Sequence, residues 1–100
     1  MNLTERQLIT VTEVFEVAGR GIFAAPVVPF ALIDSQLGGR LRLGDQLELR
    51  RPDGSVGCCS CAALEWPSPH QGGLILGLGT SVTKADVPIG TEIWRVSGVA

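Results

Sequence analysis

Three cysteines crowd into the segment Cys58-Cys59-Ser60-Cys61, and the only histidine of the chain, His70, follows soon after. Thiolate and imidazole groups bind zinc, and a thiol beside an imidazole is also the pair that forms a cysteine nucleophile. However, structural zinc takes four ligands, and adjacent or alternate cysteines chelate less well than two cysteines separated by two residues. Cys59 and Cys61 share one face of a strand, so they and His70 are weak metal candidates. The alternative, that the cysteines are small apolar core residues, is the interpretation that the sequence favours; no cofactor is expected.

Arginine is the second residue type that could take part in binding. Because the chain contains a single lysine, any basic patch must be built from arginine. Arg40, Arg42, Arg50 and Arg51 surround the base of one predicted hairpin. The guanidinium group offers a fork of donors that suits phosphate and carboxylate groups, so these residues could form a basic rim. The alternative is that they are solvated charges at strand ends. The formal net charge of −2 argues against a strongly basic nucleic-acid binder but leaves a local arginine patch open.

Sequence motifs for nucleotide chemistry are missing. The chain has no GxxxxGK[ST] segment to hold phosphates and no GxGxxG segment that opens a helix. No arrangement of residues resembles a known nucleophile motif. We therefore expect a protein that is not an enzyme.

Short strands separated by turn signals dominate the chain, and no segment keeps a helical period over three turns. A length of 100 residues fits one domain, residues 1–100, with residues 1–6 and 97–100 expected to be frayed. A helical turn is expected within residues 81–88, where Thr83 and Asp86 have the spacing of a capping box. Residues 30–39 are expected to be an irregular connection. The expected strands, which together indicate an all-β barrel or sandwich, are 8–18, 22–28, 46–51, 56–66, 74–78 and 91–96.

Three residues interrupt this strand pattern. Glu13 falls on the apolar face of the first expected strand, which predicts either a β-bulge or exposed rim position, or a carboxylate that contacts a polar ligand. Pro26 and Pro29 cannot donate hydrogen bonds to a ladder, so they are expected at an edge, a bulge or a bend.

Composition also bears on location. Apolar residues make up 45% of the chain and charged residues 18%, which excludes a disordered tail. No secretory signal is visible, and no apolar stretch approaches the ~20 residues that cross a bilayer. An odd number of clustered cysteines fits a reducing compartment, so we expect a cytoplasmic protein that does not bind membranes.

Three segments resemble a known family. Residues 11–21 (VTEVFEVAGRG) are similar to the "DVF…GRG" opening of the second domain of elongation factor Tu and its relatives. Residues 41–49 (LRLGDQLEL) look like the turn and returning strand of that domain, and residues 73–96 look like its closing strand, turn and final strand. The resemblance covers residues 8–97. It implies a small closed antiparallel β-barrel of six to seven strands, here without the GTPase domain that normally accompanies it. The residues that match the closing turn by type and spacing are Lys84, Asp86, Val87 and Gly90.

The resemblance also has departures and functional implications. Pro26 stands where the family commonly has glycine, and residues 70–73 replace the family's lead-in to the closing strand. In elongation factor Tu the second domain helps to hold the aminoacylated 3′ end of tRNA, and in other translational GTPases it contacts ribosomal RNA. By this resemblance, Arg20 matches the arginine of the GRG turn and Glu13 matches the acidic residue of "DVF".

These observations lead to two hypotheses. The first is a non-enzymatic module that binds tRNA, ribosomal RNA or a translation factor through the expected ligand-binding residues Glu13, Arg20, Arg40 and Arg42. The second is a protein-interaction module with no nucleic-acid role, for which the apolar, proline-bearing stretch 22–33 is the expected surface. A homodimer through an open barrel edge is a variant of the second hypothesis.

Overall fold

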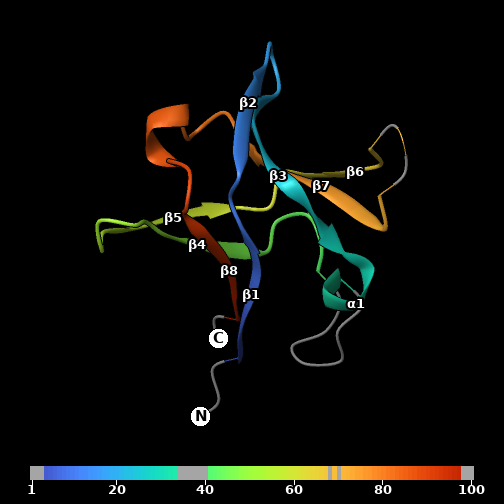
Figure 1. Ribbon diagram of the computed structural model, residues 1–100, viewed down its shortest axis with the longest axis horizontal. Helices are drawn as coiled ribbons and strands as arrows, with labels where there is room; N and C mark the ends of the chain where they lie inside the picture. Colours follow the sequence, from blue (N-terminus) through green and yellow to red (C-terminus); the bar gives the residue numbers. More distant parts are fainter. Residues whose placement is uncertain (1–3, 34–40, 68, 70, 98–100) are drawn as a thin grey trace.

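Two four-stranded antiparallel sheets make up the structure, a computed structural model that describes residues 4–33, 41–67, 69 and 71–97 (Figure 1). The strand order is β1-β8-β4-β5 in the first sheet and β2-β3-β7-β6 in the second. Arg40, an expected ligand-binding residue, and His70, a candidate metal ligand, lie outside the described residues. The elements are β1 (Thr4–Thr10), β2 (Glu13–Val17), β3 (Gly21–Pro29), α1 (Phe30–Ile33), β4 (Gln46–Arg50), β5 (Val56–Ser60), β6 (Ala63–Glu65), β7 (Gly73–Gly79), the 3₁₀ turn η1 (Lys84–Asp86) and β8 (Glu92–Ser97).

The chain passes from the first sheet to the second between Val11 and Thr12. The Val11 N–H donates to the Thr91 carbonyl at 2.8 Å, beside the first sheet, whereas the Thr12 N–H donates to the Ala25 carbonyl in β3 at 2.9 Å. The single strand expected over 8–18 is therefore two strands that meet at a corner. Strands that switch sheets in this way form the corners of two sheets packed at a large angle.

This corner also explains why Glu13 falls on the apolar face of the strand expected over 8–18. No bulge is present at Glu13, which pairs in regular register with Ala25 and is exposed, as a rim position requires. The chain changes sheet at the corner just before Glu13. Of the two alternatives, a bulge or an exposed rim position, the structure therefore shows the exposed position.

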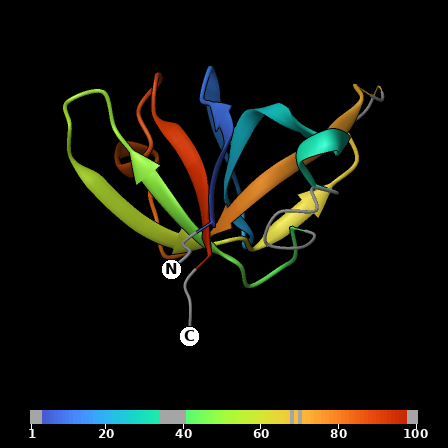
Figure 2. The same ribbon diagram turned by 90° about the horizontal axis from the view of Figure 1, so that it is seen from below.

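A second corner lies between Cys61 and Ala62. The Cys61 N–H donates to the Asp45 carbonyl at 2.9 Å, and the Ala62 N–H donates to the Gly77 carbonyl in β7 at 2.8 Å. The strand expected over 56–66 is thus β5 followed by β6, one in each sheet. Figure 2 shows the result, with β5, β4 and β8 on one side of the β1–β2 strand and β3, β7 and β6 on the other.

One core fills the space between the sheets. The inward positions of β4 and β7 are those that alternation predicts, since Leu47, Leu49, Leu76 and Leu78 are all fully buried. Cys59 and Cys61 belong to the same core. The other large side chains that are fully buried are Ile22, Ile93, Val11, Val28, Val87 and Thr91.

Several expected boundaries differ from the structure. Thr4, Glu5 and Arg6, expected to be frayed, form ladder pairs with β8, because β1 begins at Thr4. Ser97 ends β8 and pairs with Thr4, so it too is in a strand. Residues 1–3 and 98–100 lie outside the described part of the chain.

The prolines and the short helices follow local sequence signals. Pro26 sits where the register of β3 with β7 shifts between Ala24 and Val28, which agrees with the edge, bulge or bend expected for a residue without an N–H. The Thr83 N–H donates to the Asp86 carboxylate at 2.8 Å at the start of η1, as the capping spacing predicts. The connection expected over 30–39 begins with the single helical turn α1. Within the described residues, no helix has the length and apolarity needed to cross a membrane.

Candidate functional site

Aromatic residues gather on the outer face of the second sheet. The ladder places Phe15, Phe23, Gly77 and Ala63 side by side in one row across β2, β3, β7 and β6. Phe23 is only 3% exposed although it lies outside the core between the sheets. It is covered instead on the outer face, where its ring stacks on Phe15 with centroids 6.0 Å apart and the two planes inclined by 11°. The outer face therefore has an apolar cluster of its own.

Arg20 caps this aromatic cluster. The turn that joins β2 to β3 closes when the Arg20 N–H donates to the Val17 carbonyl at 2.9 Å, and this turn directs the arginine back over the sheet. The guanidinium carbon of Arg20 lies 5.1 Å from the centre of the Phe23 ring, within the range of a cation–π interaction. Nη1 of Arg20 donates to Oε1 of Glu65 at 3.0 Å, and Nη2 pairs with Oε2. Arg20 is therefore fixed in orientation by two partners, while 48% of its side chain stays exposed.

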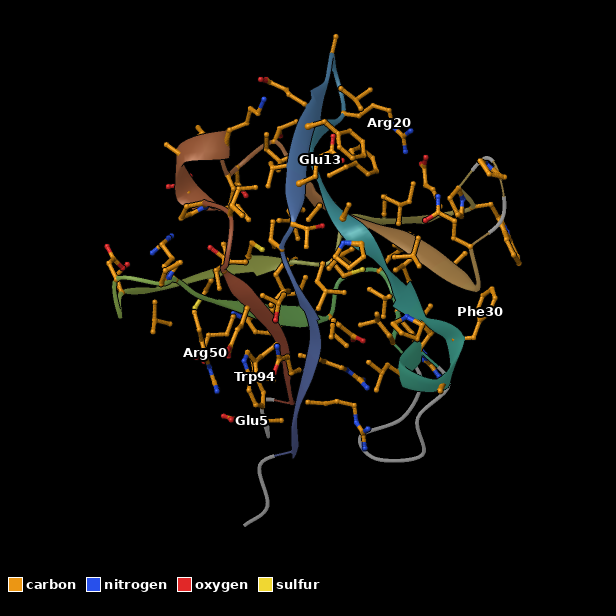
Figure 3. All side chains as sticks on the ribbon, in the orientation of Figure 1. Glu5, Glu13, Arg20, Phe30, Arg50 and Trp94 are labelled. Atoms are coloured by element: carbon orange, nitrogen blue, oxygen red, sulfur yellow. The ribbon has the colours of Figure 1, made fainter. Side chains whose placement is uncertain are left out.

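Glu13 shares this face. Glu13 and Phe15 are two residues apart on β2, so their side chains point to the same side of the sheet. Figure 3 shows Glu13 and Arg20 near the same end of the molecule. Among the interactions of the described residues, however, Arg20 pairs with Glu65 and not with Glu13. We name Glu13, Phe15, Arg20, Phe23 and Glu65 the Arg20 face.

The structure thus brings together two of the residues expected from the resemblance and adds three others. Phe15, Phe23 and Glu65 were not expected as site residues. The alternation within β2 and β3 places an aromatic residue in each strand, but their contact depends on the register between the strands. No local signal around Glu65 indicates its pairing with a turn far away in the sequence.

The basic rim expected at the β4–β5 hairpin is not assembled from the residues that the structure describes. Arg50 is held by Glu5 at 2.8 Å and by Glu48 at 2.5 Å, and its guanidinium carbon lies 4.1 Å from the centre of the Trp94 ring (Figure 3). Hydrogen bonds from Arg50 to Glu5 and then to Glu48 raise the pKa of this guanidinium. Nε of Arg51 donates to the Asp86 carbonyl at 2.7 Å.

Arg42 remains as an exposed residue in the turn before β4. Its backbone N–H donates to Oδ2 of Asp45 at 2.8 Å, which closes that turn. The same carboxylate oxygen lies 3.2 Å from Nη2 of Arg95. Arg42 and Arg20 belong to different turns, and no interaction among the described residues joins them. Of the expected ligand-binding arginines that the structure describes, Arg20 is the one that lies over an aromatic ring, so the candidate site is built on Arg20.

The cysteines divide into one exposed and two buried thiols. Cys59 and Cys61 are buried in the core, as the sequence favours, whereas Cys58 is exposed, so the core interpretation is wrong for Cys58. Burial, with smaller contributions from the neighbouring thiols, raises the pKa of Cys59 to about 11. Burial, followed by the Asp45 carboxylate, raises the pKa of Cys61 to about 11 as well. Both thiols are neutral near pH 7, where the thiolate would be needed for nucleophilic attack or metal binding.

No metal centre is evident in residues 4–33, 41–67, 69 and 71–97, which contain no group of three or more His, Cys, Asp or Glu side chains placed to hold an ion. His70, the proposed third ligand, lies outside these residues, so its relation to Cys59 and Cys61 is not described.

Comparisons with protein families, with curated proteins and with solved structures find no match to this chain.

Proposed function

We propose that the two sheets form a closed antiparallel β-barrel and that the chain is a non-enzymatic binding module of the kind that translation elongation factors use to contact tRNA or ribosomal RNA. Two corners support the closed barrel. At Val11–Thr12 and again at Cys61–Ala62, consecutive residues donate hydrogen bonds to opposite sheets. If β1–β2 and β5–β6 are each counted as one bent strand, six strands follow one another around a ring.

The observation that carries the RNA-binding proposal is the fixed position of Arg20 on Phe23. RNA is recognised through phosphate contacts and through bases that stack on aromatic rings or on guanidinium planes. An arginine that is already ordered by a ring and a carboxylate loses little side-chain entropy when a ligand binds. With nearly half of its side chain exposed, Arg20 presents a guanidinium plane and a positive charge beside an aromatic surface.

Fluorescence anisotropy with labelled tRNA and ribosomal RNA fragments at low salt tests this proposal. We expect binding that weakens as salt rises, because phosphate contacts release counterions. Arg20→Ala should weaken binding about tenfold, which corresponds to ~1.4 kcal/mol.

Arg50→Ala is the matched control, because Arg50 also stacks on an aromatic ring and pairs with glutamates but lies on the first sheet. Its RNA affinity should remain close to that of the unaltered chain. An absence of binding to any of these RNAs at low salt, or equal effects of the two substitutions, would contradict the proposal.

A second candidate function, protein interaction without nucleic acid, is favoured by Trp66. This residue is 66% exposed and packs against Phe30 with ring centroids 5.4 Å apart. The stretch 22–33 as a whole is not the exposed surface that the second hypothesis expects, because Ile22, Phe23, Ala24, Val28 and Ile33 are buried. Its contribution to this surface is Phe30, which is partly exposed beside Trp66. Exposed tryptophan is enriched among the residues that dominate binding energy at protein interfaces.

Affinity purification with the tagged chain as bait distinguishes the two functions. If Trp66 anchors a protein partner, Trp66→Ala removes a partner that Arg20→Ala retains. Leu43→Ala is the matched control, because Leu43 is an exposed apolar residue of similar exposure, 64%. Recovery of the same proteins with all three variants would exclude Trp66 as the anchor.

A further inference from the structure

The strand β5 forms one edge of the first sheet, and its hydrogen bonds to β4 follow a strict alternation. At one end the Arg51 N–H donates to the Ser55 carbonyl, and at the other the Cys61 N–H donates to the Asp45 carbonyl. In an antiparallel ladder every second residue bonds to a given neighbour. The odd-numbered residues 55–61 therefore direct their backbone groups toward β4, and the even-numbered residues direct theirs away from it. Ala62 follows this rule, since its N–H donates to the Gly77 carbonyl on the opposite side.

The outward backbone groups of β5 belong to Val56, Cys58 and Ser60. Within the part of the chain that the structure describes, none of these three residues has a backbone partner on the outward side. All three are exposed, and Val56 is 55% exposed despite its apolar side chain. Figure 1 shows that the tip of the β4–β5 hairpin extends away from the second sheet, whereas the other end of β5 leads into the corner at Cys61–Ala62, where the chain meets β7.

Edge strands normally carry features that prevent pairing with another chain. These features include inward or edge charges, proline, and bulges that twist the edge away. The segment Val56–Ser60 has neither a charged residue nor a proline, and its register with β4 is unbroken from Arg50–Val56 to Gln46–Ser60. The edge is thus a regular strand that is ready to accept another strand.

We propose that β5 pairs with β5 of a second copy of this chain, in an antiparallel arrangement centred on Cys58. A twofold axis at this position sets Cys58 opposite Cys58 of the other copy, Val56 opposite Ser60, and Gly57 opposite Cys59. Such a contact is isologous, so the same residues serve both copies and the assembly closes as a dimer. The two first sheets then form one continuous sheet across the β5 strands.

The size and charge of the β5 side chains favour a second copy of this chain as the partner of the β5 edge. Every residue that meets across the twofold axis is uncharged, and all except Val56 are small, so side chains do not obstruct pairing. The nearest charges on the outer face, Glu48 and Arg50, lie one strand back in each copy. No charge therefore opposes a like charge at the contact. A five-residue strand buries less than the ~1,000 Å² expected of a stable interface, so the dimer is a weak one that forms at high concentration.

This dimer is independent of the RNA-binding proposal, because β5 is not part of the Arg20 face. It is compatible with the proposed ring, because the ring continues through β6 and β7 after the corner at Cys61–Ala62 and leaves β5 with an open edge before it. Sedimentation equilibrium over a range of protein concentrations tests it. We expect a reversible monomer–dimer equilibrium, and Val56→Lys should weaken dimerisation at least about tenfold because a lysine on an edge strand opposes pairing. Ile89→Lys, at an apolar residue that is 62% exposed, is the matched control and should leave the dimer unchanged.

Disulfide trapping tests the register. In the presence of diamide, two Cys58 thiols form one S–S bond, and their two protons and two electrons pass to the azo group, which becomes a hydrazine. The paired residues would have Cα atoms about 5.5 Å apart, a separation that a disulfide can bridge. We expect a covalent dimer that peptide mapping assigns to Cys58, and its loss in Cys58→Ser without loss of the reversible dimer.

The double variant Cys58→Ser with Ser60→Cys supplies the register control. In the proposed pairing residue 60 faces Val56, so the two introduced thiols lie too far apart to join, and trapping should be much slower. A monomer at all concentrations, equal dimerisation of Val56→Lys and the unaltered chain, or equally fast trapping at position 60 would overturn the proposal.

Discussion

The ring of Phe23 lies directly against the backbone of Gly77. A β-carbon on Gly77 would stand 2.9 Å from Cε2 of Phe23 and 2.8 Å from Cβ of Ala63. Because Gly77 has no side chain, the Phe23 ring of the Arg20 face can pack directly against its backbone. Arg20 lies over the same Phe23 ring.

Substitution of Gly77 should disturb this cluster. Gly77→Ala forces Phe23 or Ala63 to move within a packed row, and overpacking of this kind costs about 1–3 kcal/mol of unfolding free energy. Urea denaturation measures the change. Gly57→Ala is the control, because a β-carbon there meets only the flexible end of the Arg51 side chain. Equal stability of the two variants would show that the Phe23 ring is not constrained by Gly77.

The turn that carries Arg20 depends on Gly21. This residue has φ of +95°, and a β-carbon on it would overlap the carbonyl of Gly79 in β7, which is backbone and cannot move aside. Gly21→Ala should therefore cost more than the ~1–3 kcal/mol of a strained backbone conformation alone. Gly19→Ala is the control that measures the backbone strain alone, because Gly19 has φ of +78° but no atom close enough to meet a β-carbon. Thermal unfolding of both variants should show the larger loss for Gly21→Ala, and the reverse order would contradict the close approach.

Much of the fold could be predicted from local patterns. The alternation in β4 predicts that Leu47 and Leu49 face the core, and the sequence Pro52-Asp53-Gly54-Ser55 predicts the hairpin loop. The structure closes that loop with the Gly54 N–H bonded to the Arg51 carbonyl at 2.9 Å. These features depend only on neighbouring residues, which is why the sequence contains enough information to find them.

The two corners and the partners of the site residues could not be predicted in this way. Neither Val11–Thr12 nor Cys61–Ala62 contains glycine or proline, so nothing local marks a change of sheet. The change is set by which strand accepts the next hydrogen bond, and that is a property of the assembled sheets. The pairing of Arg20 with Glu65 likewise joins residues 45 positions apart, and it depends on the register of three strand pairs.

Thiol reactivity should separate the three cysteines. Under native conditions, Ellman's reagent should modify Cys58 and spare Cys59 and Cys61, because the latter two are buried and neutral. In denaturant all three should react. Mass spectrometry of the modified peptides identifies the site. Cys58→Ser should then show almost no reaction in the native state, and rapid modification of Cys59 or Cys61 there would contradict their burial.

The buried thiols should also make stability depend on alkaline pH. Burial raises the pKa of Cys59 and of Cys61 to about 11 in the folded chain, whereas an unfolded cysteine ionises near pH 8.5. Above pH 8.5 the unfolded chain therefore binds fewer protons than the folded chain, so the free energy of unfolding falls as pH rises and stops falling near pH 11. The full shift of both thiols would correspond to roughly 7 kcal/mol, and after a discount for solvent screening the expected loss is on the order of 2–4 kcal/mol. The chain has no tyrosine and a single lysine, so few other groups titrate in this window. Urea denaturation between pH 7 and pH 11 should show this fall in the free energy of unfolding. The fall should be roughly halved in Cys59→Ala or Cys61→Ala and retained in Cys58→Ala. A free energy of unfolding that rises or stays constant between pH 7 and pH 11 would contradict the burial of both thiols.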